Sequence, residues 1–103
     1  MKVEQFYNKN QFVIRGENKT VFQSYKSEIA EINNDTGKLK LGCDWDYSKT
    51  TTKHLYLFLN DFKCILNYET REEIDNLNTV SNKRAYIQKL IDNKVIEYDE
   101  NMI

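Results

Sequence analysis

The sequence predicts a single α+β domain, and three observations lead to this prediction. The chain has 103 residues, which is enough for one hydrophobic core. Between residues 11 and 42, short runs rich in β-branched and aromatic residues alternate with turn residues, as in antiparallel strands. Further along, apolar residues recur at helical spacing. We therefore expect a four-strand antiparallel meander over residues 11–42, a main helix over 48–63 packed on that sheet, and a helical part with a short terminal strand over 70–98.

The strands of the meander are expected at four runs of the sequence: residues 11–15, 20–25, 27–32 and 38–41. Asn-Asn-Asp-Thr-Gly at 33–37 is the strongest turn signal, because these residue types tolerate positive φ. Phe12, Ile14 and Phe22 are the expected core residues of the first strands. Residues 1–10 show no sustained periodicity, so they are expected to be a lead-in segment.

Alternation in the run 27–32 would place Glu28, Ala30 and Ile32 on one face of the sheet and Ile29 on the other. Neither face is then cleanly apolar. The second face of the meander needs a cover, and the main helix is expected to supply it.

The main helix is indicated by one apolar stripe at spacing i, i+3, i+4 and i+7, formed by Leu55, Phe58, Leu59 and Phe62. Ser48 is its expected N-cap. Three consecutive threonines follow, and their hydroxyls suit a first helical turn with free backbone N–H groups.

Two shorter helices are expected after it. Thr70 and Glu73 have the spacing of a capping box, which predicts a helix from Thr70 to about Leu77. Ser81 is the expected cap of the next helix, and Asn93 its left-handed C-terminal residue. Residues 95–98 then form the terminal strand.

Charge and composition exclude several classes of function. The 15 Lys and Arg residues balance 16 Asp and Glu residues, so no basic excess argues for nucleic-acid binding. No apolar run approaches a membrane helix and no signal-peptide core precedes the domain, so we expect a cytoplasmic protein with no membrane association. Cys43 and Cys64 are expected to be core-filling thiols. The single histidine excludes a multi-histidine metal site, and we expect no metal, no cofactor and no catalytic residue.

The candidate binding residues cluster at the start of the main helix. Lys49, Lys53 and His54 accompany several hydroxyls there, and a helix N-terminus attracts anions. Arg15 and Lys26 could extend a basic surface for phosphates. The alternative is that the hydroxyls cap the helix while the lysines are solvated and His54 packs.

Trp45 and Tyr47 are expected to staple the meander to the helix, although both residue types are also frequent at interface hot spots. Asp44 and Asp46 flank Trp45. Their spacing is too short for a calcium loop, so we expect Asp46 to bond backbone N–H groups ahead of the helix.

Two longer runs, FQSYKSEIAEI at 22–32 and WDYSKTTTKHL at 45–55, carry a resemblance. The chain resembles a family of short uncharacterised proteins encoded by phages and prophages of low-GC Gram-positive bacteria, with the pattern SYxSxIA followed by WDYSxTTxKHLxxFL. The resemblance covers roughly residues 11–62. It implies a mobile-element origin but no activity, catalytic residue or cofactor. Small phage proteins are often inhibitors of host or defence machinery.

The sequence thus leaves two functions open. The first is a small non-enzymatic phage-type accessory protein that binds a host or phage protein, for example as an anti-CRISPR-like inhibitor of a defence enzyme or of a replication enzyme. The alternative is a small nucleic-acid-binding module that contacts phosphates through basic residues near the helix N-terminus. Since an open sheet edge is a natural dimer surface, we expect a monomer or a homodimer.

Overall fold

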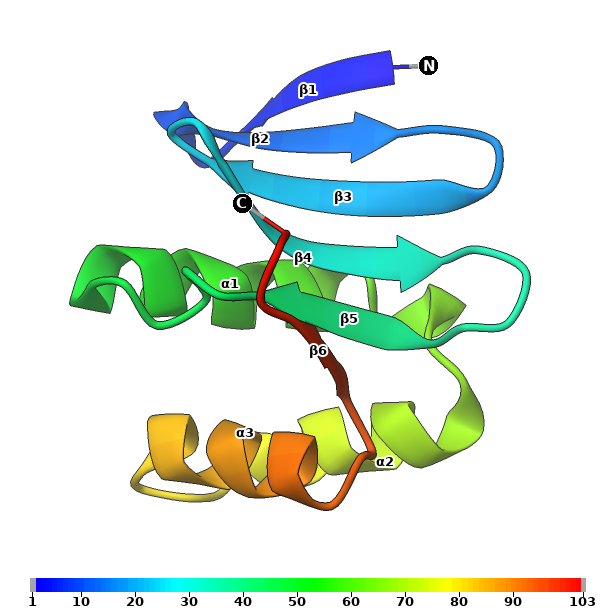
Figure 1. Cartoon of the computed structure of the whole chain (residues 1–103), viewed down its shortest axis with the longest axis vertical. Helices are drawn as coiled ribbons and strands as arrows, with labels where there is room; N and C mark the ends of the chain where they lie inside the picture. Colours follow the sequence, from blue (N-terminus) through cyan, green and yellow to red (C-terminus); the bar gives the residue numbers. More distant parts are fainter. Residues whose placement is uncertain (1, 103) are drawn as a thin grey trace.

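The computed structural model of the chain describes residues 2–102, with the backbone alone at Asn8, and confirms the α+β class. A mixed sheet of six strands stands beside three α-helices, of which α1 lies against the sheet while α2 and α3 lie beyond its β5–β6 edge (Figure 1). The elements in chain order are β1 (Lys2–Phe6), β2 (Asn8–Arg15), β3 (Lys19–Ser24), β4 (Ser27–Asn33), β5 (Leu39–Gly42), α1 (Lys49–Asp61), the 3-10 turn η1 (Lys63–Ile65), α2 (Tyr68–Leu77), α3 (Lys83–Asp92) and β6 (Glu97–Asp99).

The strands follow one another across the sheet in the order β1-β2-β3-β4-β5-β6. The pairs from β1–β2 to β4–β5 are antiparallel, whereas β6 pairs in parallel with β5, where Lys40 faces Glu97. The antiparallel meander is therefore longer than the four strands expected from the sequence. The expected lead-in segment over residues 1–10 is wrong for the described residues, because residues 2–6 form β1 and residues 8–10 begin β2.

The hairpin of β1 and β2 lacks the usual sequence signals. Tyr7 makes the turn with φ 62°, a conformation that only a few per cent of non-glycine residues adopt. The register shifts between Gln5 and Phe6, so the strand does not keep one alternation of side chains. Val3 is exposed and Glu4 pairs with Arg15 across the strands at 3.5 Å. Most of β1 is therefore defined by its pairing with β2, and Phe6 at its end is the β1 residue that packs in the core, with its ring centroid 5.7 Å from that of Phe22.

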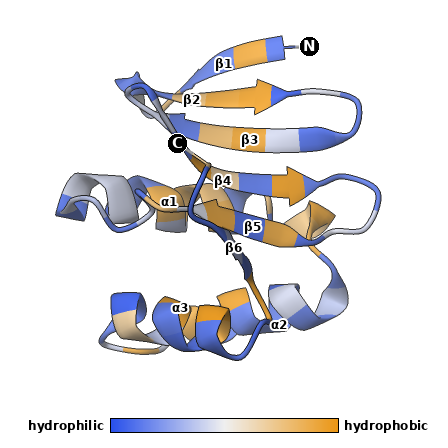
Figure 2. Ribbon diagram, viewed as in Figure 1, coloured by the Kyte–Doolittle hydropathy of each residue, from blue (hydrophilic) through white to orange (hydrophobic). Residues whose placement is uncertain are grey.

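The inner face of the sheet carries the core. Val13, Phe22, Ala30 and Leu41 lie opposite one another in successive strands, and all four are buried. The Phe58 ring of α1 stacks on Phe22 with centroids 5.4 Å apart. Hydrophobic residues concentrate in the strands and helices, whereas the connecting loops are mostly hydrophilic (Figure 2).

Two expected core residues lie on the other face. The alternation in β2 turns Gln11 and Val13 inward, so Phe12 and Ile14 point to the outer face and are only half-buried. The expectation that Phe12 and Ile14 pack in the core beside Phe22 is therefore wrong. The run QFVIR offers apolar residues to both faces, and the register with β3 decides between them.

A β-bulge explains why β4 has no clean alternation. Phe22 faces Ala30, but its neighbour Gln23 faces Glu28, which leaves Ile29 as the extra residue. Ile29 and Ala30 are consequently both buried although they are adjacent in sequence. The expectation that Ile29 and Ala30 lie on opposite faces of the sheet is therefore wrong, because the bulge interrupts the alternation between them.

Helix α1 begins as expected. Ser48 is its N-cap with extended backbone, and its hydroxyl accepts a hydrogen bond from the N–H of Thr51 at 3.1 Å. The apolar stripe of α1 faces the sheet, where Leu55, Phe58 and Leu59 are buried. The helix ends at Asp61, two residues short of the expected range.

The caps of the two later helices differ from the expected ones. Asn67 caps α2, since its side chain accepts from the N–H of Thr70, and Thr70 is a buried residue within the helix. Asn82 rather than Ser81 caps α3, with the N–H of Ala85 as donor. After α3 the left-handed residue is Lys94 at φ 62°, not Asn93.

The turn before β5 is confirmed. Gly37 adopts φ 74°, and its N–H donates to the carbonyl of Asn33 at 2.7 Å. A Cβ at Gly37 would also run into the backbone of Asn67, which donates to the Gly37 carbonyl at 2.9 Å. This turn therefore ties the meander to the start of α2.

Candidate functional site

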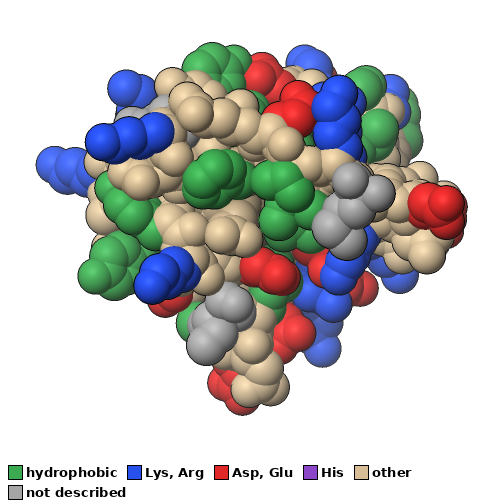
Figure 3. Space-filling view, turned by 90° about the horizontal axis from the view of Figure 1, so that it is seen from above, with side chains coloured by type: hydrophobic (Ala, Val, Ile, Leu, Met, Phe, Trp, Pro, Cys, Tyr) green, Lys and Arg blue, Asp and Glu red, His purple; other side chains and the backbone are tan. Residues whose placement is uncertain are grey.

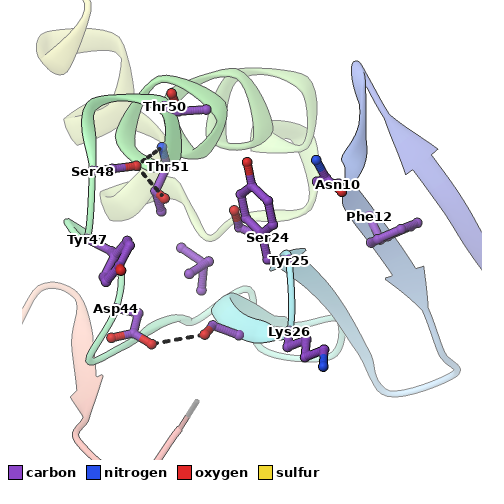
Figure 4. Close-up of a pocket in the computed structure, with 12 residues that line it drawn as sticks. Asn10, Phe12, Ser24, Tyr25, Lys26, Asp44, Tyr47, Ser48, Thr50 and Thr51 are labelled. Atoms are coloured by element: carbon purple, nitrogen blue, oxygen red, sulfur yellow. Dashed lines mark hydrogen bonds between the residues drawn. The ribbon is translucent and has the colours of Figure 1, made fainter.

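A groove of about 820 Å³ opens between the β3–β4 turn and the N-terminus of α1 (Figure 4). Its volume lies in the range of small-ligand pockets. Side chains from four regions line it: β2, the β3–β4 hairpin, the loop after β5, and the first turn of α1. The lining residues are Asn10, Phe12, Ser24, Tyr25, Lys26, Ser27, Ile29, Asp44, Tyr47, Ser48, Thr50 and Thr51.

Tyr25 stands in the mouth of the groove on a strained turn. Its φ of 56° is rare for a bulky residue, and neighbouring hydrogen bonds hold it. The Tyr25 N–H donates to the Asn10 carbonyl at 2.7 Å, and the Gln23 amide donates to the Tyr25 carbonyl at 2.9 Å. The ring remains 57% exposed and points toward α1 in Figure 4. Lys26 follows on the same turn and reaches the rim.

The loop after β5 forms the opposite wall. Trp45 is buried in the core, which agrees with its expected stapling role. The Arg84 guanidinium of α3 forms an ion pair with the Asp46 carboxylate at 2.6 Å. This ion pair replaces the backbone bonds expected for Asp46. The expectation that Tyr47 staples the meander to the helix beside Trp45 is wrong, because Tyr47 is 80% exposed at the groove rim.

Asp44 closes the end of the groove far from α1, where Ser27 donates to its carboxylate at 3.0 Å. The adjacent Cys43 thiol has a raised pKa, mainly because of desolvation and secondly because of the Asp44 charge. Cys43 is half-buried and Cys64 is exposed, so the expected core role fails for Cys64. A raised pKa disfavours the thiolate at Cys43.

The first turn of α1 supplies the polar end of the groove. The first intrahelical bond runs from the Thr52 N–H to the Ser48 carbonyl, so the N–H groups of Lys49 and Thr50 precede the helical ladder. No acidic residue stands in this turn. Its positive dipole end therefore faces the groove without a carboxylate of its own.

The basic residues singled out from the sequence do not form one surface. Lys26 lines the groove, whereas Lys49 and Lys53 are exposed on α1 outside the lining. Arg15 lies at the other end of α1, with its guanidinium 4.9 Å from the Phe62 ring centroid. His54 is buried, and its Nδ1 lies 2.9 Å from the Thr50 carbonyl, in keeping with the packing alternative.

Two buried polar residues, Ser24 and Gln11, lie beside the groove and carry no signal in the sequence. Ser24 and Gln11 face each other across β3 and β2, and both point to the inner face of the sheet. Ser24 is 3% exposed and Gln11 is 0% exposed, and neither side chain has a hydrogen-bond partner within residues 2–102. Sequence patterning could not find them, because serine and glutamine are ordinarily exposed residue types.

The described residues offer little for other chemistry. No group of three His, Cys, Asp or Glu side chains within residues 2–102 could hold a metal ion. None of the helices in this range has the length and apolar character to cross a bilayer. Looking down on the β1 edge, basic and acidic side chains are interspersed with hydrophobic ones rather than segregated (Figure 3).

A family of unknown function, DUF8033, matches residues 1–76. The chain belongs to this family. The DUF8033 match spans β1 to β5, α1 and most of α2, and so includes every residue that lines the groove; α3 and β6 lie outside it. No curated protein and no solved structure matches the chain.

Proposed function

We propose that this DUF8033 protein is a non-enzymatic binding protein that recognises another protein through the groove between the β3–β4 turn and α1. The observation that carries the proposal is the pair of exposed tyrosines, Tyr25 and Tyr47, at the rim of an 820 Å³ groove. Tyrosine is enriched at interface hot spots, because it combines a large apolar ring with a polar tip. The narrower form of the proposal is a phage-type accessory protein that inhibits a host defence or replication enzyme, and it draws on the motif resemblance.

The charge distribution favours a protein partner over nucleic acid. Arg15 forms an ion pair with Glu4 on the neighbouring strand. Lys19 and Lys40 both form ion pairs with Glu31 on the sheet. A nucleic-acid surface needs several unpaired basic groups that follow one backbone. Lys26 is the one basic residue among those that line the groove.

Affinity capture from a low-GC Gram-positive lysate, with and without nuclease, tests this proposal. Tyr47→Ser is the test variant, and Tyr68→Ser on α2 is its matched control, since the two rings are 80% and 72% exposed. We expect one stoichiometric protein that survives nuclease, is lost with Tyr47→Ser and is kept with Tyr68→Ser. Recovery of nucleic acid alone, lost at high salt, would overturn the proposal in favour of the nucleic-acid module.

A further inference from the structure

We propose that the α1 end of the groove is a binding site for an anionic oxygen group, a carboxylate or a phosphate, attached to an apolar body. The carrier would be an acidic or phosphorylated side chain of the partner protein. That part of the inference rests on the proposed function, whereas the anion site itself does not.

The first argument is the N-terminus of a long helix at the groove. Helix α1 has 13 residues, and its first-turn N–H groups and dipole favour negative charge. The Ser48 hydroxyl accepts a hydrogen bond from the N–H of Thr51. The N–H groups of Lys49 and Thr50 precede Thr52, whose N–H makes the first intrahelical hydrogen bond. The Thr50 and Thr51 side chains both line the groove at this end.

The second argument is independent of the helix. Ser24 lines the groove from the sheet, follows Phe22 by two residues and so points toward α1 (Figure 4). Its hydroxyl is buried and has no partner within residues 2–102. Natural proteins satisfy most buried polar groups, so an unpartnered hydroxyl that lines a groove indicates a ligand acceptor.

The third argument concerns polarity along the groove. The Asp44 carboxylate, held by Ser27, lies at the end of the groove far from α1, and Lys26 lies at that same end, beside Ser27 (Figure 4). Tyr25 and Tyr47 line the groove as well and add apolar ring surface. The positive end of the α1 dipole therefore favours an anionic group at the α1 end, away from the Asp44 carboxylate, which sets the orientation of a ligand.

The test is a ¹⁵N-correlation NMR titration of the full chain at constant ionic strength. Phenyl phosphate and phenylacetate present the two anions on one ring, and benzylamine is the matched probe of opposite charge. We expect saturable shifts of the Ser24, Lys49 and Thr50 amides with the anions and none with benzylamine. Stronger binding of phenyl phosphate would identify a phosphorylated side chain, and stronger binding of phenylacetate an acidic one. Equal shifts with benzylamine, or none with either anion, would overturn the site.

Variants separate a ligand contact from a structural effect. Ser24→Ala should weaken anion binding by roughly ten-fold, the loss of one hydrogen bond to a charged group, while its melting temperature does not fall. Ser81→Ala, remote from the groove, should change neither. Lys26→Gln should change the affinity by less than about two-fold, because Lys26 lies at the Asp44 end of the groove. Wild-type affinity in Ser24→Ala would contradict the site.

The two proposals fail in different ways. If the anions bind but no protein is captured, the anion site stands and the proposed function fails. If a partner is captured through Tyr47 while neither anion shifts the α1 amides, the proposed function stands and this inference fails.

Discussion

Replacing Gln11 by Met is expected to stabilise the fold, although it removes a polar group. The Gln11 amide is completely buried, and neither its nitrogen nor its oxygen has a hydrogen-bond partner within residues 2–102. A buried unsatisfied group costs about 1–3 kcal/mol, and Met has nearly the same length and shape without the amide. We therefore expect the free energy of unfolding to rise by about 1–3 kcal/mol.

Urea denaturation with a two-state fit measures this change, and an unchanged slope would show that the unfolded state is unaffected. Gln5→Met is the matched control, because Gln5 is exposed on β1 and its replacement should stay within about 0.5 kcal/mol. A Gln11→Met variant that is no more stable than the wild type would refute the reasoning. It would mean that the amide is satisfied in solution.

Three further predictions concern packing, capping and thiol chemistry. Phe58→Ala should destabilise the fold by about 3–5 kcal/mol in the same urea assay, since Phe58 is fully buried against the sheet; a loss under 1 kcal/mol would contradict its place in the core. Asn82→Ala should cost about 1 kcal/mol while Ser81→Ala costs under about 0.5, because the α3 cap is Asn82; the reverse order would contradict this assignment. Iodoacetamide at pH 8 should alkylate the exposed Cys64 faster than Cys43, because the raised pKa of the Cys43 thiol leaves a smaller fraction of Cys43 as the reactive thiolate. Peptide mass mapping over time measures the two rates, and equal rates would argue against the raised pKa of Cys43.

Features that depend on neighbouring residues could be predicted from the sequence. The stripe of α1 and the cap at Ser48 follow from helical spacing and from a side chain that bonds three residues ahead. The Gly37 turn follows from local backbone freedom. The caps at Asn67 and Asn82 could not be distinguished from Thr70 and Ser81, because each pair offers two competent side chains within one turn.

Features that depend on strand pairing could not be predicted. The burial of adjacent Ile29 and Ala30 needs the bulge opposite Phe22, and no local pattern encodes that register. β1 exists because β2 offers an edge to pair with. Of the candidate site, the sequence identified Tyr47 and Lys26 but grouped them with Arg15, and it missed the inward-facing Ser24.

The parallel pairing of β6 with β5 has a consequence for biosynthesis. β5 is translated before α1, α2 and α3, but its neighbour β6 emerges only after all three helices. At about 5–20 residues per second, the β5 edge stays open for several seconds on the ribosome. During that interval Leu41 and Gly42 expose unpaired backbone groups, which other strands can engage. The nascent chain is therefore most exposed to mispairing, and to capture by chaperones, before its terminal strand docks.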